Sequence, residues 1–172
     1  IYGDNKDEKL IDEIKFGLDY VLKLQNEYGG VYNKVVSKNF ADFVSPELDE
    51  QETYLLSPWT SVTASFAGIT GLAYEAFKND DKELADKCLN AHNKAIDYLL
   101  NNQNPSNPKN PDEFNVGTYY VENETDERLF AYSVAYKLTR DNKYKELCKS
   151  LLDIGVDSDN MVANCRTYAY IV

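Results

Sequence analysis

Two neighbouring carboxylates, Asp126 and Glu127, stand at the predicted start of an amphipathic helix. Thr125 directly precedes them, and threonine is a residue type that caps helices through its hydroxyl oxygen. Negative charge in a first turn also interacts favourably with the helix dipole, by about 0.3 to 1 kcal/mol. Helix capping and dipole compensation therefore explain this pair without any ligand, and a binding role is the alternative interpretation.

Four aromatic residues stand outside the apolar stripes of the predicted helices. Tyr119 and Tyr120 lie in the loop before Thr125, Tyr32 lies in an earlier loop, and Trp59 follows a proline at a helix start. Aromatic faces stack on the apolar C–H surfaces of sugar rings, so loop aromatics are suited to a carbohydrate site. Ordinary packing is the alternative for each tyrosine and the favoured interpretation for Trp59.

The elements that carry these residues are predicted to be helices, because apolar residues recur at helical spacing through most of the chain. Gly29 and Gly30 end the first helix, and a polar stretch with three prolines follows the third. No stretch is convincing as a strand. The predicted helices cover residues 7–26, 59–77, 81–102, 142–154 and 160–170, with a further helix that begins at Thr125.

Short acidic turns alternate with long loops along this helical pattern. Antiparallel helical hairpins place short turns at one end and long loops at the other. We therefore predict one all-α domain, residues 1–172, with the loops of Tyr32 and Tyr119 at the same end. The short turns are residues 79–82 and 140–143, and the long loops are residues 31–58 and 112–124.

The chain is strongly acidic, with 29 Asp and Glu against 18 Lys and Arg, for a formal net charge of −11. Such a charge repels the phosphate backbone of nucleic acids and anionic membrane surfaces. No run approaches the roughly 20 apolar residues that cross a bilayer. A neutral polymer or small molecule is therefore the expected partner, and we expect neither nucleic acid nor a membrane.

The sequence resembles glycoside hydrolase family 9, the inverting cellulases, in six segments that occur in the family's order. They include GGVYNKV at residues 29–35, where the family has GGVYHKV, and the DER motif at residues 126–128 that enters an aromatic helix. The resemblance implies about half of an (α/α)6 toroid and a β-1,4-glucan polysaccharide as substrate. The segments are Leu10 to Gln25, Gly29 to Val35, Pro46-Glu47, Pro58 to Ala67, Ala85 to Leu99 and Asp126 to Tyr136.

The resemblance also implies a calcium site. In family members that bind calcium near the cleft, adjacent acidic side chains at the DER motif are ligands, together with a loop oxygen just before it and a later aspartate. These positions correspond to Asp126 and Glu127, to Glu122 or Asn123, and to Asp157. Hard oxygen ligands from two loops suit calcium.

Two departures from the family bear on binding and on catalysis. Asn33 replaces the family's histidine in GGVYHKV, so this sugar-binding position keeps hydrogen-bonding capacity but loses an imidazole. The family's catalytic base, in an Asp-Ala-Gly-Asp segment, and its late glutamate acid would lie before Ile1 and beyond Val172. Since inversion needs both carboxyl groups, roughly 6.5 to 9.5 Å apart, we expect no catalytic residue here and no activity of the chain alone.

These patterns favour part of a secreted β-1,4-glucan hydrolase, with Tyr32, Asn33, Tyr119 and Tyr120 as substrate contacts. Secretion is implied by a polymer substrate too large to enter a cell, and the rest of the catalytic domain is an expected partner. A non-catalytic helical-repeat protein that binds carbohydrate or acts as a scaffold is the main alternative. A second is a toroid glycosidase for unsaturated uronides, although an anionic substrate calls for a basic cleft.

Overall fold

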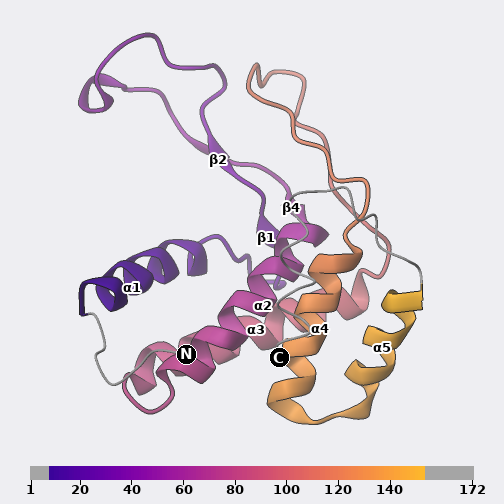
Figure 1. The fold of residues 1–172 in the computed structure, drawn as a ribbon. Helices are drawn as coiled ribbons and strands as arrows, with labels where there is room; N and C mark the ends of the chain where they lie inside the picture. Colours follow the sequence, from indigo (N-terminus) through magenta and orange to yellow (C-terminus); the bar gives the residue numbers. More distant parts are fainter. Residues whose placement is uncertain (1–7, 154–172) are drawn as a thin grey trace.

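The computed structural model describes residues 8–153, which form five α-helices and two small antiparallel ladders (Figure 1). Five of the predicted helices are confirmed, and the one predicted over residues 160–170 lies outside the described residues. Among the described residues, no helix combines the length and the apolar character needed to cross a membrane. The helices are α1 (Glu8–Leu22), α2 (Thr60–Phe77), α3 (Lys82–Asn101), α4 (Thr125–Thr139), α5 (Asn142–Asp153) and the short 3-10 helix η1 (Pro46–Leu48).

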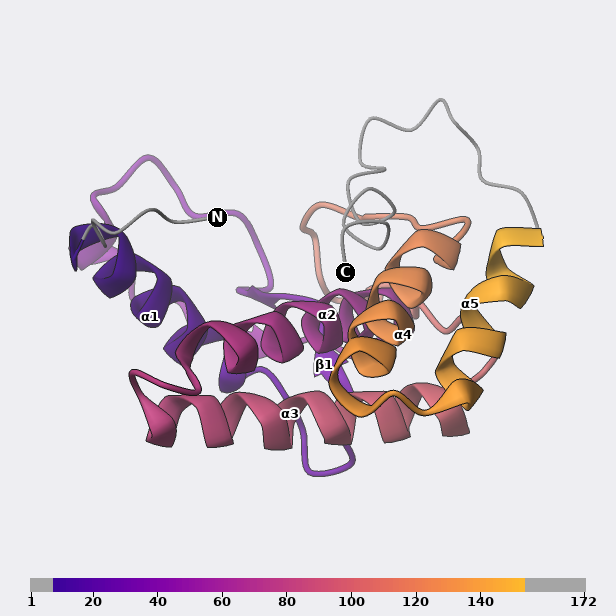
Figure 2. The same cartoon turned by 60° about the horizontal axis from the view of Figure 1, so that its bottom comes forward.

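α2 is the central helix, and it packs against both α3 and α4 (Figure 2). Its small residues permit this close approach. A Cβ atom added at Gly68 would lie 2.2 Å from the Phe130 ring of α4, and one at Gly71 would lie 2.4 Å from Val134. The core between the three helices is correspondingly dense. It includes the buried residues Ala64, Phe66, Ala67, Ala95, Leu99, Ala131 and Ala135.

The helices form the predicted hairpins, whose short turns lie at the end opposite the long loops (Figure 1). Between α2 and α3, the Asp81 carboxylate caps α3 by accepting from the backbone N–H of Leu84 at 3.2 Å. Between α4 and α5, Arg140 adopts a left-handed conformation with φ of 58°. α1 joins the α2–α3 turn through Lys15, whose ammonium donates to Asp81 at 2.7 Å.

The first helix ends four residues earlier than predicted, at Leu22 instead of residue 26. The reason is that Gln25 already belongs to the segment that follows. It forms an isolated antiparallel bridge with Val31, and its side-chain amide donates to the carbonyl groups of Gly29 and Ala91 at 3.1 and 2.9 Å. These polar contacts replace the helical ones that the apolar spacing predicts.

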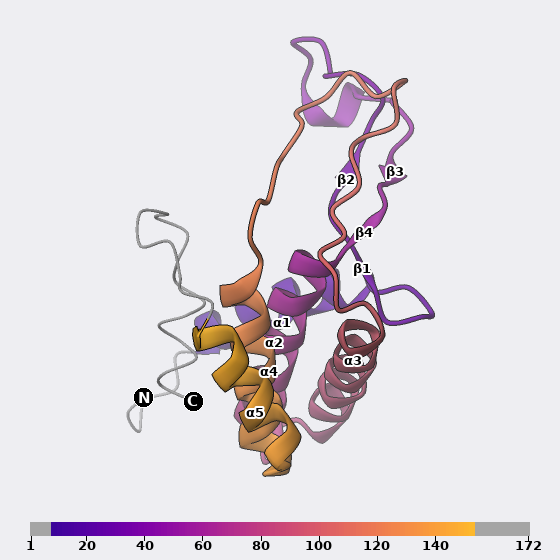
Figure 3. The same ribbon diagram turned by 90° about the vertical axis from the view of Figure 1, so that its right-hand side faces the viewer.

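The prediction that the chain lacks strands is wrong in the first long loop. β1 (Val31–Tyr32) pairs with β4 (Pro58–Trp59), and β2 (Val35–Val36) pairs with β3 (Tyr54–Leu55), both antiparallel. A strand of two residues is too short to show an alternating pattern, so the sequence gives no periodic signal for it. The two ladders make this loop leave the helices and return to them as a narrow ribbon (Figure 3).

Candidate carbohydrate-binding loops and acidic helix start

Two long loops extend together from one end of the helices (Figures 1 and 3). We call residues 33–57 and 103–121 together the loop arm. The backbone N–H of Asn115 in the second loop donates to the carbonyl of Lys38 in the first at 2.7 Å. The two loops therefore form one structural unit, although they are far apart in the sequence.

The loop arm brings Tyr119 close to the strand that carries Tyr32. Lys34, two residues after Tyr32, places its Nζ atom 4.9 Å from the centroid of the Tyr119 ring. The predicted shared end of the two loops is therefore confirmed. Tyr119 and Tyr120 are 68% and 79% exposed, whereas Tyr32 is half-buried in β1. Both exposed rings are accessible to a ligand, and their contact with sugar stays a prediction.

Asn33 lies between Tyr32 and Lys34 and has an unsatisfied side-chain oxygen. Its Oδ1 atom is buried and accepts no hydrogen bond from any described residue. A buried acceptor without a donor costs about 1 to 3 kcal/mol. The hydroxyl group of a ligand or a water molecule could supply that donor, which is consistent with the predicted binding role.

Trp59 is a packing residue, as its sequence position favours. Its side chain is 4% exposed, and its indole N–H donates to the carbonyl of Pro108 at 3.1 Å. The next residue, Thr60, donates its backbone N–H to the carbonyl of Ser106 at 3.0 Å. The start of α2 is therefore bonded directly to the base of the second loop.

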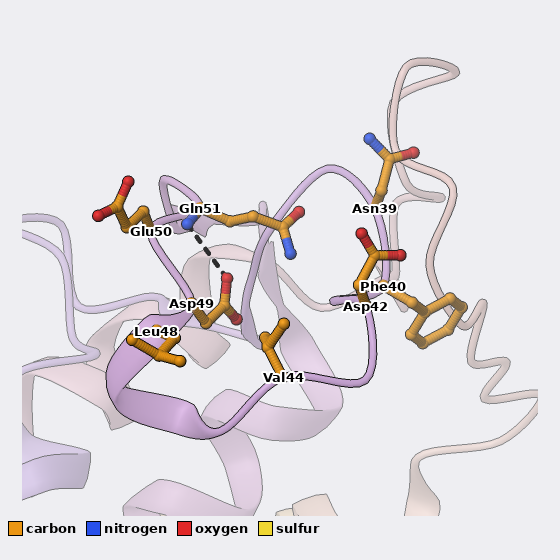
Figure 4. Close-up of a pocket in the computed structure, with 8 residues that line it drawn as sticks. All are labelled: Asn39, Phe40, Asp42, Val44, Leu48, Asp49, Glu50 and Gln51. Carbon is orange, nitrogen blue, oxygen red and sulfur yellow. Dashed lines mark hydrogen bonds between the residues drawn. The ribbon is translucent and has the colours of Figure 1, made fainter.

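A shallow hollow of about 560 Å³ lies within the first loop (Figure 4). Its lining mixes carboxylates with apolar side chains, and the only hydrogen bond drawn there joins the N–H of Gln51 to the Asp49 carboxylate at 3.1 Å. None of the four predicted sugar contacts lines it. The lining residues are Asn39, Phe40, Asp42, Val44, Leu48, Asp49, Glu50 and Gln51.

Asp126 and Glu127 lie in the first turn of α4, as predicted, but the predicted cap is wrong by one residue. Glu124 occupies the N-cap position, and Thr125 is the first helical residue. The side-chain oxygen of Asn123 accepts from the backbone N–H of Thr125 at 2.9 Å. Asn123 therefore satisfies an N–H group at the helix start, since the Glu124 side chain is engaged elsewhere.

Of the two neighbouring carboxylates, Glu127 has the buried oxygen without a hydrogen-bond partner and the raised pKa. Its Oε2 atom is buried and accepts no hydrogen bond within the described part of the chain. Burial raises the pKa of Glu127 to about 8, and a hydrogen bond and charge repulsion from Asp126 act in the same direction, with a smaller contribution from Glu124. A cation at this position would stabilise the ionised form, because opposite charge lowers a carboxyl pKa.

The ligand set implied for calcium is incomplete within residues 8–153. Asp157 lies outside the described residues, and the Asn123 side-chain oxygen already accepts from Thr125. No group of three or more His, Cys, Asp or Glu side chains with metal-binding geometry occurs among the described residues. The unsatisfied oxygen of Glu127 is thus the local feature that fits a cation.

Sequence reasoning missed a buried ion pair next to these carboxylates. The Arg128 guanidinium donates to Glu124 at 2.5 Å, with both side chains at most 6% exposed. The other Glu124 oxygen accepts from the Thr60 hydroxyl at 2.6 Å, and Arg128 donates to the carbonyl of Asn102 at 2.7 Å. The pair joins the start of α4 to the start of α2 and the end of α3. The four-residue spacing of Glu124 and Arg128, which is typical of ion pairs along a helix, is the sequence feature that could have predicted this pair.

The family model for glycosyl hydrolase family 9 matches residues 2–166. The chain belongs to this family. It is 36% identical over 136 residues to a cellodextrinase of Butyrivibrio fibrisolvens, covering 79% of this chain and 25% of that protein. It is 30% identical over 181 aligned positions to endoglucanase D of Acetivibrio thermocellus, covering 98% of this chain and 28% of that protein. The chain therefore spans about a quarter of the length of these relatives.

Solved structures of the family share the fold. The family 9 endoglucanase J30 superimposes with a TM-score of 0.82 at 25% identity, covering 95% of this chain and 31% of that one. A metagenome-derived family 9 endoglucanase gives a TM-score of 0.80, also at 25% identity, with 95% and 30% coverage. The architecture is accordingly all-α, with helical hairpins that form part of an (α/α)6 toroid.

Proposed function

We propose that this chain supplies a substrate-binding face to a β-1,4-glucan hydrolase that acts by inversion outside the cell. The observation that carries the proposal is the loop arm, which holds Tyr119 and Tyr120 with exposed rings, Tyr119 against Lys34 two residues after Tyr32. Exposed aromatic rings bind the apolar faces of sugars. A xyloglucan-specific endo-β-1,4-glucanase of Bacteroides ovatus, 28% identical over 154 residues, supports the same class of polymer.

The chain alone is proposed to be inactive, because we assign neither catalytic carboxyl group to it. Many of its acidic side chains on helices are bound to neighbouring lysines. Lys82 contacts Asp86, and Lys87 contacts Glu83, each at 2.8 Å. Such surface ion pairs are typical of solvated helix faces and contribute little to stability. They do not resemble the separated acid and base that inversion requires.

The remaining helices of the family's domain are proposed to cover α1. Phe16 and Tyr20 lie four residues apart on this helix and are 74% and 52% exposed. Side chains at this spacing share a helix face. An exposed apolar face of this kind is typical of a surface that contacts further protein.

The acidic start of α4 is proposed to bind calcium. Asp126 and Glu127 would provide carboxylate oxygens, Asn123 a loop oxygen, and Asp157 a further carboxylate. The buried Glu127 oxygen without a partner supports this assignment. Bound calcium would neutralise the repelling carboxylates and so favour one conformation where the second loop enters α4.

Two measurements test the proposed function. Turnover of carboxymethyl cellulose by the chain should be absent under conditions in which a full-length family 9 endoglucanase is active. Binding of cellohexaose, followed by calorimetry, should weaken in Tyr119→Ala and Tyr120→Ala. Tyr28→Ala is the matched control, since Tyr28 is 76% exposed but lies outside the loop arm. Turnover comparable to that of the relative, or equal losses in all three variants, would contradict the proposal.

A further inference from the structure

Lys34 occupies the junction between the two ladders of the first loop. It follows β1 and precedes β2, and its backbone carbonyl accepts from the N–H of Leu56 at 3.1 Å. Leu56, which directly follows β3, is itself 6% exposed, so burial holds the partner segment at this point. The main chain of Lys34 therefore has a defined position relative to the helices.

The side chain of Lys34 crosses from the first loop to the second. Its ammonium donates to the carbonyl of Gly117 at 2.6 Å and lies 4.9 Å from the centroid of the Tyr119 ring. The Gly117 carbonyl also accepts from the Asn110 side-chain amide at 3.3 Å, within the second loop. One cation thus contacts both the backbone and the aromatic ring of the segment that presents Tyr119.

The ammonium of Lys34 contacts a carbonyl and a ring, although the chain has 29 Asp and Glu residues that could pair with a lysine. Within the described range, Lys34 forms no ion pair with a carboxylate, whereas Lys15, Lys78, Lys82 and Lys87 each form one. Partial burial lowers the pKa of Lys34, because it disfavours the charged ammonium. A carbonyl and a ring compensate for that loss, so the contact is specific to the second loop.

We propose that Lys34 is a positioning residue that orients Tyr119 for binding a glucan chain. The ammonium lies over one face of the ring, and the ring is still 68% exposed, so the opposite face is accessible to a sugar. Holding the ring in one orientation before binding reduces the entropy that a ligand must overcome. This inference rests on the proposed function, because it assigns the ligand of Tyr119.

Lys38 provides a matched comparison within the same loop. Its ammonium also lies over a tyrosine, 5.4 Å from the centroid of the Tyr54 ring. Tyr54, however, is held independently by an edge-to-face contact with Phe114 and by a hydrogen bond to Glu52 at 2.6 Å. Loss of the Lys38 ammonium should therefore leave the ring of Tyr54 in place.

The first experiment measures cellohexaose affinity by calorimetry for Lys34→Met, Lys34→Arg and Lys38→Met. Lys34→Met should weaken binding roughly tenfold, because the ring loses its cation and the loop loses its bond to Gly117. Lys34→Arg keeps a cationic donor and should restore most of the affinity. Lys38→Met should bind like the unchanged chain. In a Tyr119→Ala background, Lys34→Met should cause no further loss, because coupled residues are not additive.

The second experiment needs no sugar. Chymotrypsin cleaves after tyrosine, so the rate of cleavage after Tyr119 or Tyr120, followed by mass spectrometry, reports how firmly this segment is held. Cleavage should accelerate severalfold in Lys34→Met and stay unchanged in Lys38→Met.

The outcomes separate the two proposals. If the unchanged chain binds no glucan, the proposed function fails, and the positioning role of Lys34 fails with it. The rate of chymotrypsin cleavage then reports only whether Lys34 holds the second loop. If the unchanged chain binds and Lys34→Met binds equally well, the positioning role is overturned whatever the cleavage rate. Weaker binding that persists at full size in the Tyr119→Ala background would also overturn it, since Lys34 would then act through another group.

Discussion

The helix core and the loop arm are stabilised in different ways. α2, α3 and α4 bury a dense set of small and apolar side chains, and Gly68 and Gly71 bring the helices into close contact. The loop arm depends on a few cross-contacts, such as the Asn115 to Lys38 hydrogen bond and the Lys34 to Gly117 bond. The predicted sugar contacts lie in or beside the loop arm. The proposed binding face is thus held mainly by polar contacts, whereas the helices are held by apolar packing.

The buried pair of Glu124 and Arg128 lies at the border between the two regions, and breaking it is expected to have the largest effect. Arg128→Met should destabilise the chain by about 3 to 5 kcal/mol, because Glu124 then loses its counter-charge inside the protein. Urea unfolding measures the change. The exposed pair of Lys82 and Asp86 supplies the control, and Lys82→Met should cost less than about 1 kcal/mol.

A double variant distinguishes charge from packing at the same place. Arg128→Met combined with Glu124→Leu removes both charges, so it should be more stable than Arg128→Met alone. The opposite order of stabilities would show that loss of the Thr60 hydrogen bond to Glu124, which only the double variant removes, outweighs removal of the unpaired charge.

Calcium binding at the start of α4, which we propose above, is expected to have the next largest effect. At a hundredfold excess over its Kd, a ligand that binds only the folded state stabilises it by about 2.7 kcal/mol. Melting should therefore occur at a higher temperature with calcium than with a chelator, when measured above the Glu127 pKa of about 8. Asp126→Ala should remove the difference. Identical melting with calcium and chelator would leave Asp126 and Glu127 as a helix start only.

The two regions also differ in how well the sequence predicts them. The helices follow from apolar spacing, and the hairpins follow from the short acidic turns at Asp80 and Asp141, because both signals are local. The two ladders and the contact between Lys34 and Gly117 join residues 18 to 83 positions apart, and no local pattern encodes such pairings. The exposed tyrosines could be singled out from the sequence, but the lysine that contacts Tyr119 could not.

Overpacking the core should destabilise the helices without altering the loop arm. Gly68→Ala should cost about 1 to 3 kcal/mol, because its Cβ would lie 2.2 Å from the Phe130 ring. Gly17→Ala on α1 is the matched control. Among residues 8–153, no atom beyond the neighbouring backbone of α1 lies within 4 Å of its added Cβ, so helix propensity should make this change neutral or stabilising by up to about 1 kcal/mol. Urea unfolding measures the free energy of unfolding of both variants. Under conditions in which Gly68→Ala is folded, its affinity for cellohexaose should be unchanged.

The smallest expected effect is a pH dependence that comes from the core alone. His92 is the single histidine of the chain and is 1% exposed, with its Nδ1 atom 2.7 Å from the carbonyl oxygen of Ala67. Burial lowers the pKa of His92 below the ordinary 6.5, although the hydrogen bond to Ala67 opposes that shift. The unfolded chain therefore binds a proton more readily than the folded chain as pH falls below 6.5, and stability from this group is lost there.

His92→Gln isolates this contribution, because glutamine can still donate to Ala67 but does not titrate. Unfolding free energies of both proteins, measured by urea at about pH 5 and about pH 7.5, should converge at the lower pH. The affinity for cellohexaose at neutral pH should be the same in both proteins, since His92 on α3 packs against Ala67 and Gly71 of α2. If the unfolding free energies of the two proteins change equally with pH, His92 does not titrate in this range. A change in cellohexaose affinity in His92→Gln would show that the helix core and the loop arm are coupled.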